Sequence, residues 1–560
     1  MKYFLNYHIY ILLLFFNPAF VEAQDIESIG KKQPVKLTGS LGFNNTFYHA
    51  TGIDNRRPPY LWYLMGNVNI NLYGWSVPLS VYYSNQNVQF RQPFNQYGMS
   101  PKYKWITAHL GYRNMTFSPY TLGGITFFGA GVELTPGIVR FSAMYGRLYK
   151  AIQEDTTSSS NIVPAFKRMG GGFKIGVGKN GDFIDLSVFA AKDDVSSLPY
   201  IPVASNVLPA SNLVFGINGQ KKIAKKVVVS AEYASSAYTR DVTAQESDRP
   251  ASVFTPFIVN KQSTQYHKAF KTTIAYNAKF YGIAFGYERI DPDFKTMGSY
   301  FFNNDLINYT VAPSLRLFDQ KLSINANVGI QKNNIQKQDV STVKRTLMSF
   351  NVNFMPSQKW NFAAQYSNFI MYNRISTKFS QFNTLDSLNF YQVTESANFN
   401  TAYNTGTKER KHGVNMNVSF QRANQTQGES VTSNTSLFYN GNLSYRINLT
   451  PTSTTISVGC NANQNTVGGI PSIAIGPSVS LGKLFFEKKL RTNVSVTYNT
   501  TFKDKKSSGD AWNASATAGY TYRKHHNLNM NLLVLNRDAI GLNAVSFTEY
   551  TLIAGYGYTF

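Results

Sequence analysis

The chain of 560 residues contains a single cysteine, Cys460, and no long apolar run after its first 23 residues. One cysteine excludes an intramolecular disulfide. No run approaches the about 20 apolar residues that a membrane-spanning helix needs, and the mean hydropathy is −0.24. Zinc-ligand spacing, a P-loop and a Gly-x-Ser-x-Gly motif are all lacking. We therefore expect no cofactor, no metal site, no catalytic residues and no enzymatic activity.

Aromatic residues and two-residue periodicity are abundant instead. Aromatics make up 15% of the chain, and many segments alternate a polar with an apolar residue, as strands do. Asparagine is a poor strand former, so its repetition on one face indicates a surface that faces water. A β-sandwich also alternates, but with its apolar face inward. The clearest such segments are 67–72, 323–328, 350–354, 414–418 and 493–498.

The last eleven residues, 550–560, continue this pattern and end on an aromatic residue. In lipid every backbone polar group must be paired within the protein, so a sheet can span a membrane only as a closed barrel with an apolar outer face. The ending resembles the C-terminal assembly signal of bacterial outer-membrane proteins, which Gly555, Tyr558 and Phe560 match. Ile553 occupies the place where a polar residue is usual. The predicted outer face comprises Tyr550, Leu552, Ala554, Tyr556, Tyr558 and Phe560.

The beginning of the chain agrees with export. Lys2 precedes an apolar run from Tyr10 to Phe16, and a small residue, Ala23, precedes Gln24. These features are typical of a secretory signal peptide. We expect a signal peptide at 1–23, a short periplasmic segment at 24–34 and a barrel at 35–560, located in the bacterial outer membrane. Cys460 lies two residues after Val458 and four after Ile456, so it shares their face of the strand and is expected to face lipid rather than to act as a nucleophile.

Turn chemistry predicts the topology. Short connections such as 73–75, 319–321 and 450–452 alternate with longer polar loops such as 239–265 and 502–510. Short turns belong on the periplasmic side of such barrels and long loops on the outer side. With both termini periplasmic the strand number is even. The prediction is an all-β, closed antiparallel transmembrane β-barrel of about 24 strands, within a range of 22 to 26.

One segment, 87–123, breaks the alternation. It is rich in aromatics, proline and glycine, and connections of this length tend to be functional. A barrel of this size needs closing, and residues 24–34 are too few for a separate plug domain. We expect 87–123 to be a pore-constricting insertion folded into the lumen, with Arg91, Lys102, Lys104 and Arg113 as the pore-constriction residues. The alternative is one more wall hairpin beginning near Trp105, which gives 26 strands.

The charge balance leaves two interpretations open. Lysine and arginine number 54 against 30 acidic residues, a net charge of +24. The surplus either lines the pore and favours anions or meets lipid phosphates at the rim. The expected partners are outer-membrane lipid and lipopolysaccharide, the barrel-assembly machinery and other envelope proteins. Nucleic acid is not expected as a partner.

The mature chain resembles porin-like outer-membrane β-barrel proteins of Bacteroidota, through its export signal, Asn-rich strands and aromatic end. That resemblance implies the fold and the location much more than an activity. Our first functional expectation is a channel that passes small solutes, including anions. The alternative is a non-conducting barrel that serves as scaffold or partner of an envelope secretion or surface complex.

Overall fold

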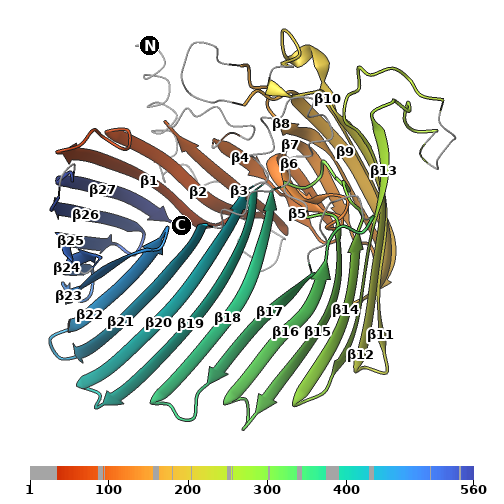
Figure 1. Ribbon diagram of the computed structural model, residues 1–560. Coiled ribbons are helices and arrows are strands. Elements are labelled where there is room, and N and C mark those ends of the chain that lie inside the picture. The colour runs from red at the N-terminus through yellow and green to blue at the C-terminus, as the bar shows by residue number, and fades with distance from the viewer. Residues whose placement is uncertain are drawn as a thin grey trace, which may run out of the picture.

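The computed structural model describes residues 35–85, 93, 95–154, 163–179, 181–202, 205–248, 254, 256–300, 303–336, 344–373, 390–427, 434–504, 506–541 and 544–560. The expected signal peptide, the segment 24–34 and Arg91 lie outside the described residues. The described residues form one sheet of 27 strand segments, shown in Figure 1.

The first half of the sheet comprises β1 (Val35–Thr51), β2 (Tyr60–Leu72), β3 (Trp75–Ser84), β4 (Gln96–Met99), β5 (Lys102–Tyr103), β6 (Ile106–Thr116), β7 (Gly123–Leu134), β8 (Val139–Tyr149), β9 (Lys167–Lys179), β10 (Asp182–Asp194), β11 (Ser211–Ile223), β12 (Val227–Thr239), β13 (Thr264–Asn277) and β14 (Tyr281–Ile290). The second half comprises β15 (Leu306–Leu317), β16 (Leu322–Lys332), β17 (Lys344–Phe354), β18 (Trp360–Asn373), β19 (Phe390–Gly406), β20 (Arg410–Gln427), β21 (Asn434–Leu449), β22 (Thr454–Val467), β23 (Ile470–Phe485), β24 (Leu490–Lys503), β25 (Lys506–Tyr522), β26 (His526–Ala539) and β27 (Phe547–Thr559).

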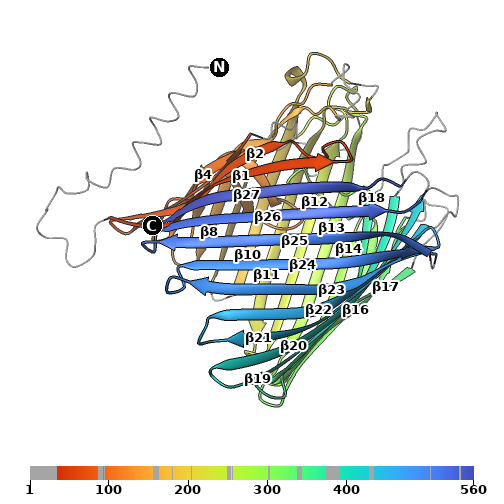
Figure 2. The same cartoon turned by 90° about the vertical axis from the view of Figure 1, so that its left-hand side faces the viewer.

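The sheet closes on itself. β1 pairs with β2 on one side and with β27 on the other, from Ser40↔Thr559 to Thr51↔Thr548, as Figure 2 shows. β4 and β5 both lie between β3 and β6, so they are two pieces of one wall strand. The wall among the described residues therefore has 26 strands, one fewer than the 27 segments. The predicted closed antiparallel barrel is confirmed, at the upper end of the expected range.

Most of the described part of segment 87–123 lies in the barrel wall and not in the lumen. Its described residues 96–99, 102–103 and 106–116 pair with β3 and β7 and belong to the wall. The expectation that the whole segment folds into the lumen is therefore wrong. The alternative of a further wall hairpin and 26 strands is correct, but the hairpin consists of β4/β5 and β6, with Trp105 in its turn rather than at its start. Among the described residues of this segment, the six between β6 and β7, 117–122, leave the wall.

Short connections between strands lie mainly at one end of the barrel and long ones mainly at the other. Turns as short as 73–74, 224–226 and 523–525 lie at the end where β1 begins and β27 finishes. The opposite end carries most of the long connections, so by the usual rule the short-turn end is periplasmic. The predicted long loop at 502–510 is wrong, because β24 and β25 continue through it to 503 and from 506.

The two faces of the wall separate as the alternation predicts. Met416 on β20 pairs with Leu443 on β21, which pairs with Cys460 on β22, and the side chains of Met416 and Leu443 are 39% and 54% exposed. This is the apolar face. On the final strand, Gly555 lies beside the side chains of Asn44 and Asn529 on the polar face, so the predicted outer face of β27 is confirmed. Within the described residues, no helix is both long and apolar enough to cross a membrane.

Candidate functional site: the lumen and its inward loops

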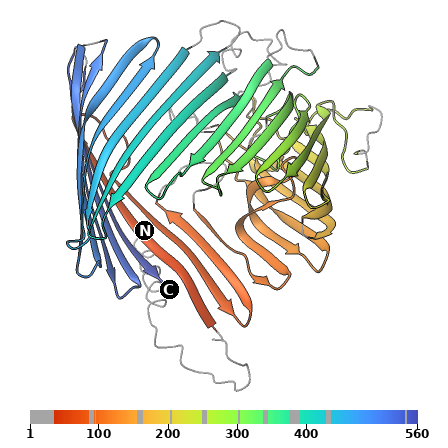
Figure 3. The same cartoon turned by 90° about the horizontal axis from the view of Figure 1, so that it is seen from below.

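Two connections at the long-loop end fold into the barrel, and we call them the inward loops: residues 117–122 and 291–300. Tyr120 lies three residues before β7, so its backbone can extend at most about 10 Å from that strand. Its hydroxyl nevertheless donates a 2.5 Å hydrogen bond to Glu288 Oε1 on β14. Because β7 and β14 are seven strand spacings apart, about 34 Å along the wall, the loop must cross the lumen to make this contact. The wall curls tightly around it, as Figure 3 shows for the orange and yellow strands.

The two inward loops bind each other through main-chain atoms. Leu122 and Gly298 form a parallel bridge, and the N–H of Gly123 donates to the Gly298 carbonyl at 2.8 Å. The Thr296 hydroxyl donates to the Thr121 carbonyl at 2.5 Å. These polar groups lie in the interior, where an unpaired donor or acceptor costs about 1–3 kcal/mol. Their pairing joins the two loops into one unit.

An apolar core holds this unit against the wall. Leu122, Phe189 and Phe294 are fully buried, and each such side chain contributes about 1.5–3 kcal/mol by its burial. Small residues on the wall leave the necessary room: a Cβ at Gly216 would lie 2.7 Å from Thr121 Cγ2. The residues of this core on β6 to β15 and the inward loops are Met115, Phe117, Tyr120, Leu122, Ile125, Phe127, Met144, Leu148, Phe189, Ala191, Ala210, Val214, Ala234, Ala269, Ile290, Phe294, Met297 and Leu306.

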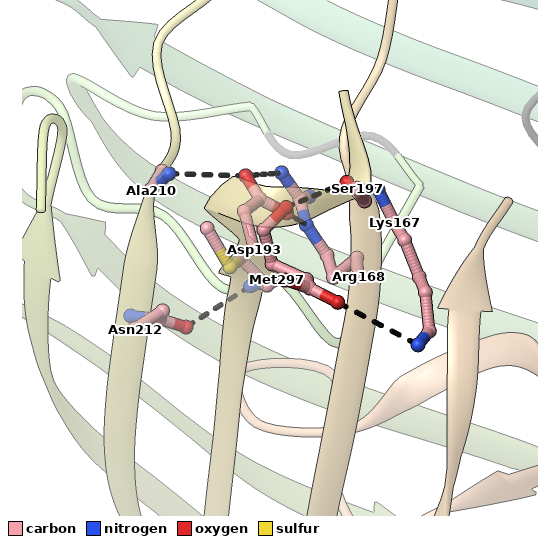
Figure 4. A network of polar contacts seen from close by, with 8 residues as sticks. Lys167, Arg168, Asp193, Ser197, Ala210, Asn212 and Met297 are labelled. Carbon is pink, nitrogen blue, oxygen red and sulfur yellow. Dashed lines mark hydrogen bonds and ion pairs between the residues drawn. The ribbon is translucent and has the colours of Figure 1, made fainter. Parts of the chain in front are cut away.

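A polar network fixes the long-loop end of the same wall, as Figure 4 shows. Arg168 on β9 makes a bidentate ion pair with Asp193 on β10, at 2.8 and 3.0 Å. Asp193 is 3% exposed and also accepts from the Ala210 N–H. Asn212 on β11 accepts the N–H of Met297 at 3.0 Å. The bidentate pair specifies the geometry of β9 and β10, and the Asn212 contact holds Met297 of the 291–300 loop beside β11.

Toward the middle of the barrel a polar row replaces the apolar core. We call it the polar row, and it is formed by residues directly opposite one another on successive strands. It runs through Arg140, Gly176, Asp185, Asn218, Glu232, Lys271, Glu288, Asn308 and Gln331, from β8 to β16. Three acids and two bases alternate with amides. The row therefore carries no excess of positive charge.

Internal ion pairs and hydrogen bonds neutralise part of the polar row. Arg140 Nη2 lies 3.1 Å from Asp185 Oδ2, and the Asp185 side chain is 1% exposed. Glu288 accepts from the Tyr120 hydroxyl and, through Oε2, from Asn308 at 3.0 Å. Burial raises the pKa of the Tyr120 phenol, and the nearby Glu288 carboxylate raises it further. Tyr120 therefore stays protonated and remains a donor to Glu288 at neutral pH.

The lumen face of the remaining wall carries rows of uncharged, hydrogen-bonding side chains. Asn400, Asn417, Asn442 and Asn461 lie opposite one another on β19 to β22, and Asn442 Nδ2 donates to Asn461 Oδ1 at 2.5 Å. A second row has Ser457, Ser480, Ser495 and Ser515 on β22 to β25. Such rows suit contact with water and give no group that would hold a charged solute strongly.

The three predicted pore-constriction residues that the structure describes, Lys102, Lys104 and Arg113, are not brought together. Lys102 lies on β5, and Lys104 lies in the short turn that follows, with its ammonium 5.2 Å from the Tyr103 ring centroid. Arg113 lies on β6 and donates from Nη1 to Ser80 Oγ at 2.6 Å. Nine residues of strand between Lys104 and Arg113 correspond to about 30 Å. A shared constriction of Lys104 and Arg113 is therefore excluded, and a role for any one of them stays a prediction.

Sequence reasoning missed the residues that do meet in the lumen. The polar row draws a single residue from each of nine strands, so no local motif marks it. The 291–300 loop carries no local signal that separates it from the other long connections between strands. Among the described residues, no group of three or more His, Cys, Asp and Glu side chains could hold a metal ion.

Comparison with known proteins gives weak similarities. No family model and no curated protein match the chain. Among solved structures, the P pilus usher PapC translocation pore is 10% identical, with a TM-score of 0.38 over 94% of this chain and 99% of that chain. The FrpB iron transporter from Neisseria meningitidis is 10% identical, with a TM-score of 0.39 over 93% and 82%. Acinetobacter baumannii OccAB3 is 10% identical, with a TM-score of 0.29 over 63% and 92%.

Similarities of this size carry no argument about activity. The class follows from the wall itself: a closed antiparallel sheet with an apolar outer face and a polar inner face satisfies its backbone in lipid, which an open sheet cannot do. The protein is an outer-membrane β-barrel with 26 described wall strands.

Proposed function

We propose that this barrel is a channel for small hydrophilic solutes. The observation that carries the proposal is the lumen face of β19 to β25, where the asparagine and serine rows run in register across the wall. Amide and hydroxyl groups replace the hydration of a passing solute without binding it tightly, which conduction requires. A barrel that served only as a scaffold would not need rows of amide and hydroxyl side chains across the lumen face of this many strands.

The inward loops are the proposed element that limits solute size. They occupy the lumen beside β7 to β15 and are anchored by buried side chains and by main-chain hydrogen bonds. Barrels of 22 strands are already wide enough to need closing. A fixed unit within the lumen narrows the path to the part lined by asparagine and serine, and small solutes are then selected by size first.

The finer proposal is that anions pass more readily than cations. Its support is the net charge of +24 on the chain. The polar row contributes three acids and two bases, so the positive surplus lies on other parts of the chain. The surplus would then act as a weak field along the path rather than as one constriction.

Liposome swelling tests the proposal. The refolded protein should admit arabinose and glucose faster than the larger neutral sugar raffinose, and should admit anionic solutes faster than cationic ones of equal size. A variant in which residues 117–122 are replaced by a Gly-Ser hexapeptide should admit raffinose as well. Folded protein that swells no liposomes in either form would reject the channel.

A second candidate is a scaffold for an envelope partner. The connection between β12 and β13 exposes Phe257 and Val259 by 67% and 59%, and exposed apolar side chains of this kind are suited to a protein contact. The aromatic segment 379–391 is another docking candidate in the sequence, and it lies largely outside the described residues. Co-purification of the barrel from its native membrane separates the two: a stoichiometric partner that is lost with Phe257→Ser supports the scaffold.

A further inference from the structure

A basic recess lies at the short-turn end of the lumen, away from the inward loops. It has a volume of about 600 Å³ and is formed at the ends of β18 to β21. The residues lining it are Gln358, Lys359, Asn404, Thr405, Gly406, Thr407, Lys411, His412, Gly413, Arg446 and Asn448. Its size falls within the range of about 300–1,000 Å³ that is usual for small-molecule sites.

The recess is on the lumen face. Asn404, Gly413 and Arg446 lie opposite one another on β19, β20 and β21. Each is four residues along its strand from the asparagine row of Asn400, Asn417 and Asn442 and so shares its face, because side chains of a strand alternate with a period of two. A solute in the lumen would meet these side chains directly.

The charge of the recess has one sign. Lys359, Lys411 and Arg446 line it, and no aspartate or glutamate does. Within the described part of the chain, none of these three bases is ion-paired with an acid. The amides of Gln358, Asn404 and Asn448 add neutral donors. Three cationic groups and several amide N–H donors together match the oxygen atoms of a phosphate or carboxylate group.

Gly413 provides the space between these groups. A Cβ at position 413 would lie 3.1 Å from Asn404 Oδ1 and 3.7 Å from Arg446 Nη2. The glycine thus lets the flanking side chains of Asn404 and Arg446 extend over the wall, and any larger residue would fill the floor of the recess. The space above Gly413, the three basic side chains and the amide donors therefore all lie in the same recess.

We propose that this recess is a binding site for a small anion that carries phosphate or carboxylate groups. Arg446 supplies the planar pair of donors, Lys411 and Lys359 supply positive charge from the neighbouring strand and turn, and Asn404 and Asn448 complete the hydrogen bonding. The site lies at the periplasmic mouth of the lumen, and binding there does not require that the barrel conduct.

Isothermal titration calorimetry of the refolded full-length barrel tests the site, with inorganic phosphate and citrate as the two probes and sucrose as the neutral comparison. We expect phosphate or citrate to bind and sucrose not to bind, and the tighter of the two anions identifies the chemical group. Arg446→Gln and Lys411→Gln should each weaken binding at least about tenfold, the loss expected for a hydrogen bond to a charged group. Lys225→Gln, on the exposed turn between β11 and β12, removes the same charge elsewhere and should leave affinity unchanged.

Gly413→Leu tests the recess without changing charge. It should abolish binding, because the leucine side chain occupies the space between Asn404 and Arg446. Absence of binding by the unaltered protein would overturn the proposal. So would an affinity equal to that of the unaltered protein in the Arg446→Gln and Lys411→Gln variants, or in folded Gly413→Leu. Liposome swelling without anion binding would reject this site and leave the channel standing, so the two failures are distinguishable.

Discussion

The contact between the inward loops makes a sharp prediction for Gly298→Ala. The backbone at Gly298 does not have a positive φ, so alanine is permitted there and only the space decides. The added methyl group would lie well inside contact distance of the Thr121 carbonyl oxygen, 2.9 Å from Leu122 Cα and 3.0 Å from Phe189 Cε1. Two of these three atoms belong to the main chain and cannot rotate away, so the loops must separate.

Overpacking of this kind costs about 1–3 kcal/mol, which corresponds to about a 5- to 150-fold increase in the opened population. The N–H groups of Gly123 and Met297, which donate to Gly298 and Asn212, should exchange with deuterium faster by that factor. Gly519→Ala is the matched control, because an added Cβ at Gly519 meets no atom within 4 Å. Exchange measured by mass spectrometry on peptides covering 117–123 and 294–300 reports the change. Equal exchange in Gly298→Ala and Gly519→Ala would refute the docking of the loops.

Three further predictions concern the lumen and the wall. Arg140→Gln leaves the 1%-exposed Asp185 without its ion pair and should lower the free energy of unfolding, measured in urea, by about 2–4 kcal/mol. This is the lower part of the range for a broken buried pair, because Arg140 is partly solvated. The double variant Arg140→Gln with Asp185→Asn should recover most of the lost stability, and no recovery would contradict the pairing. Tyr120→Phe removes the hydrogen bond to Glu288 and should cost about 1.5–3 kcal/mol at pH 7. The folded-state pKa of Tyr120 is raised above its ordinary value of about 10. The stability that Tyr120 contributes is therefore complete below about pH 10 and declines as the pH rises further. Urea unfolding should show this loss of stability at alkaline pH in the unaltered protein and not in Tyr120→Phe. Cys460 lies on the apolar face beside Leu443, so in liposomes it should resist a charged methanethiosulfonate reagent, whereas Asn461→Cys in a Cys460→Ser background should react; the reverse pattern would invert the two faces.

The wall of this barrel was largely predictable from the sequence, because each strand carries its own signal. The alternation of asparagine with aliphatic residues at 67–72 or 414–418 fixes which face is polar, and glycine or proline marks turns such as 73–74, 135–138 and 450–453. The failure at 96–116 has a local cause. Pro101 and Ser100 divide that wall strand into β4 and β5, and Gly98 and Gly111 approach each other closely, so the segment has the composition of a loop although it pairs as a strand.

The site was less predictable, because it depends on contacts across the lumen. Residues 117–122 lie within the segment expected to fold inward, and this part of the expectation matches the burial of all of them except Pro119. Their partner, the 291–300 loop, follows a strand far away in the chain, and only the curl of the wall brings the two together. The polar row and the basic recess likewise arise from the register of neighbouring strands, which a single sequence does not reveal.

Single-channel recording in planar bilayers tests the central claim most directly. The account predicts discrete current steps from the refolded barrel, a modest preference for anions, and larger and less selective steps when residues 117–122 are replaced by a Gly-Ser hexapeptide. Folded protein that remains silent both with and without these residues would contradict it, because an asparagine- and serine-lined lumen freed of its inward loop would then conduct nothing.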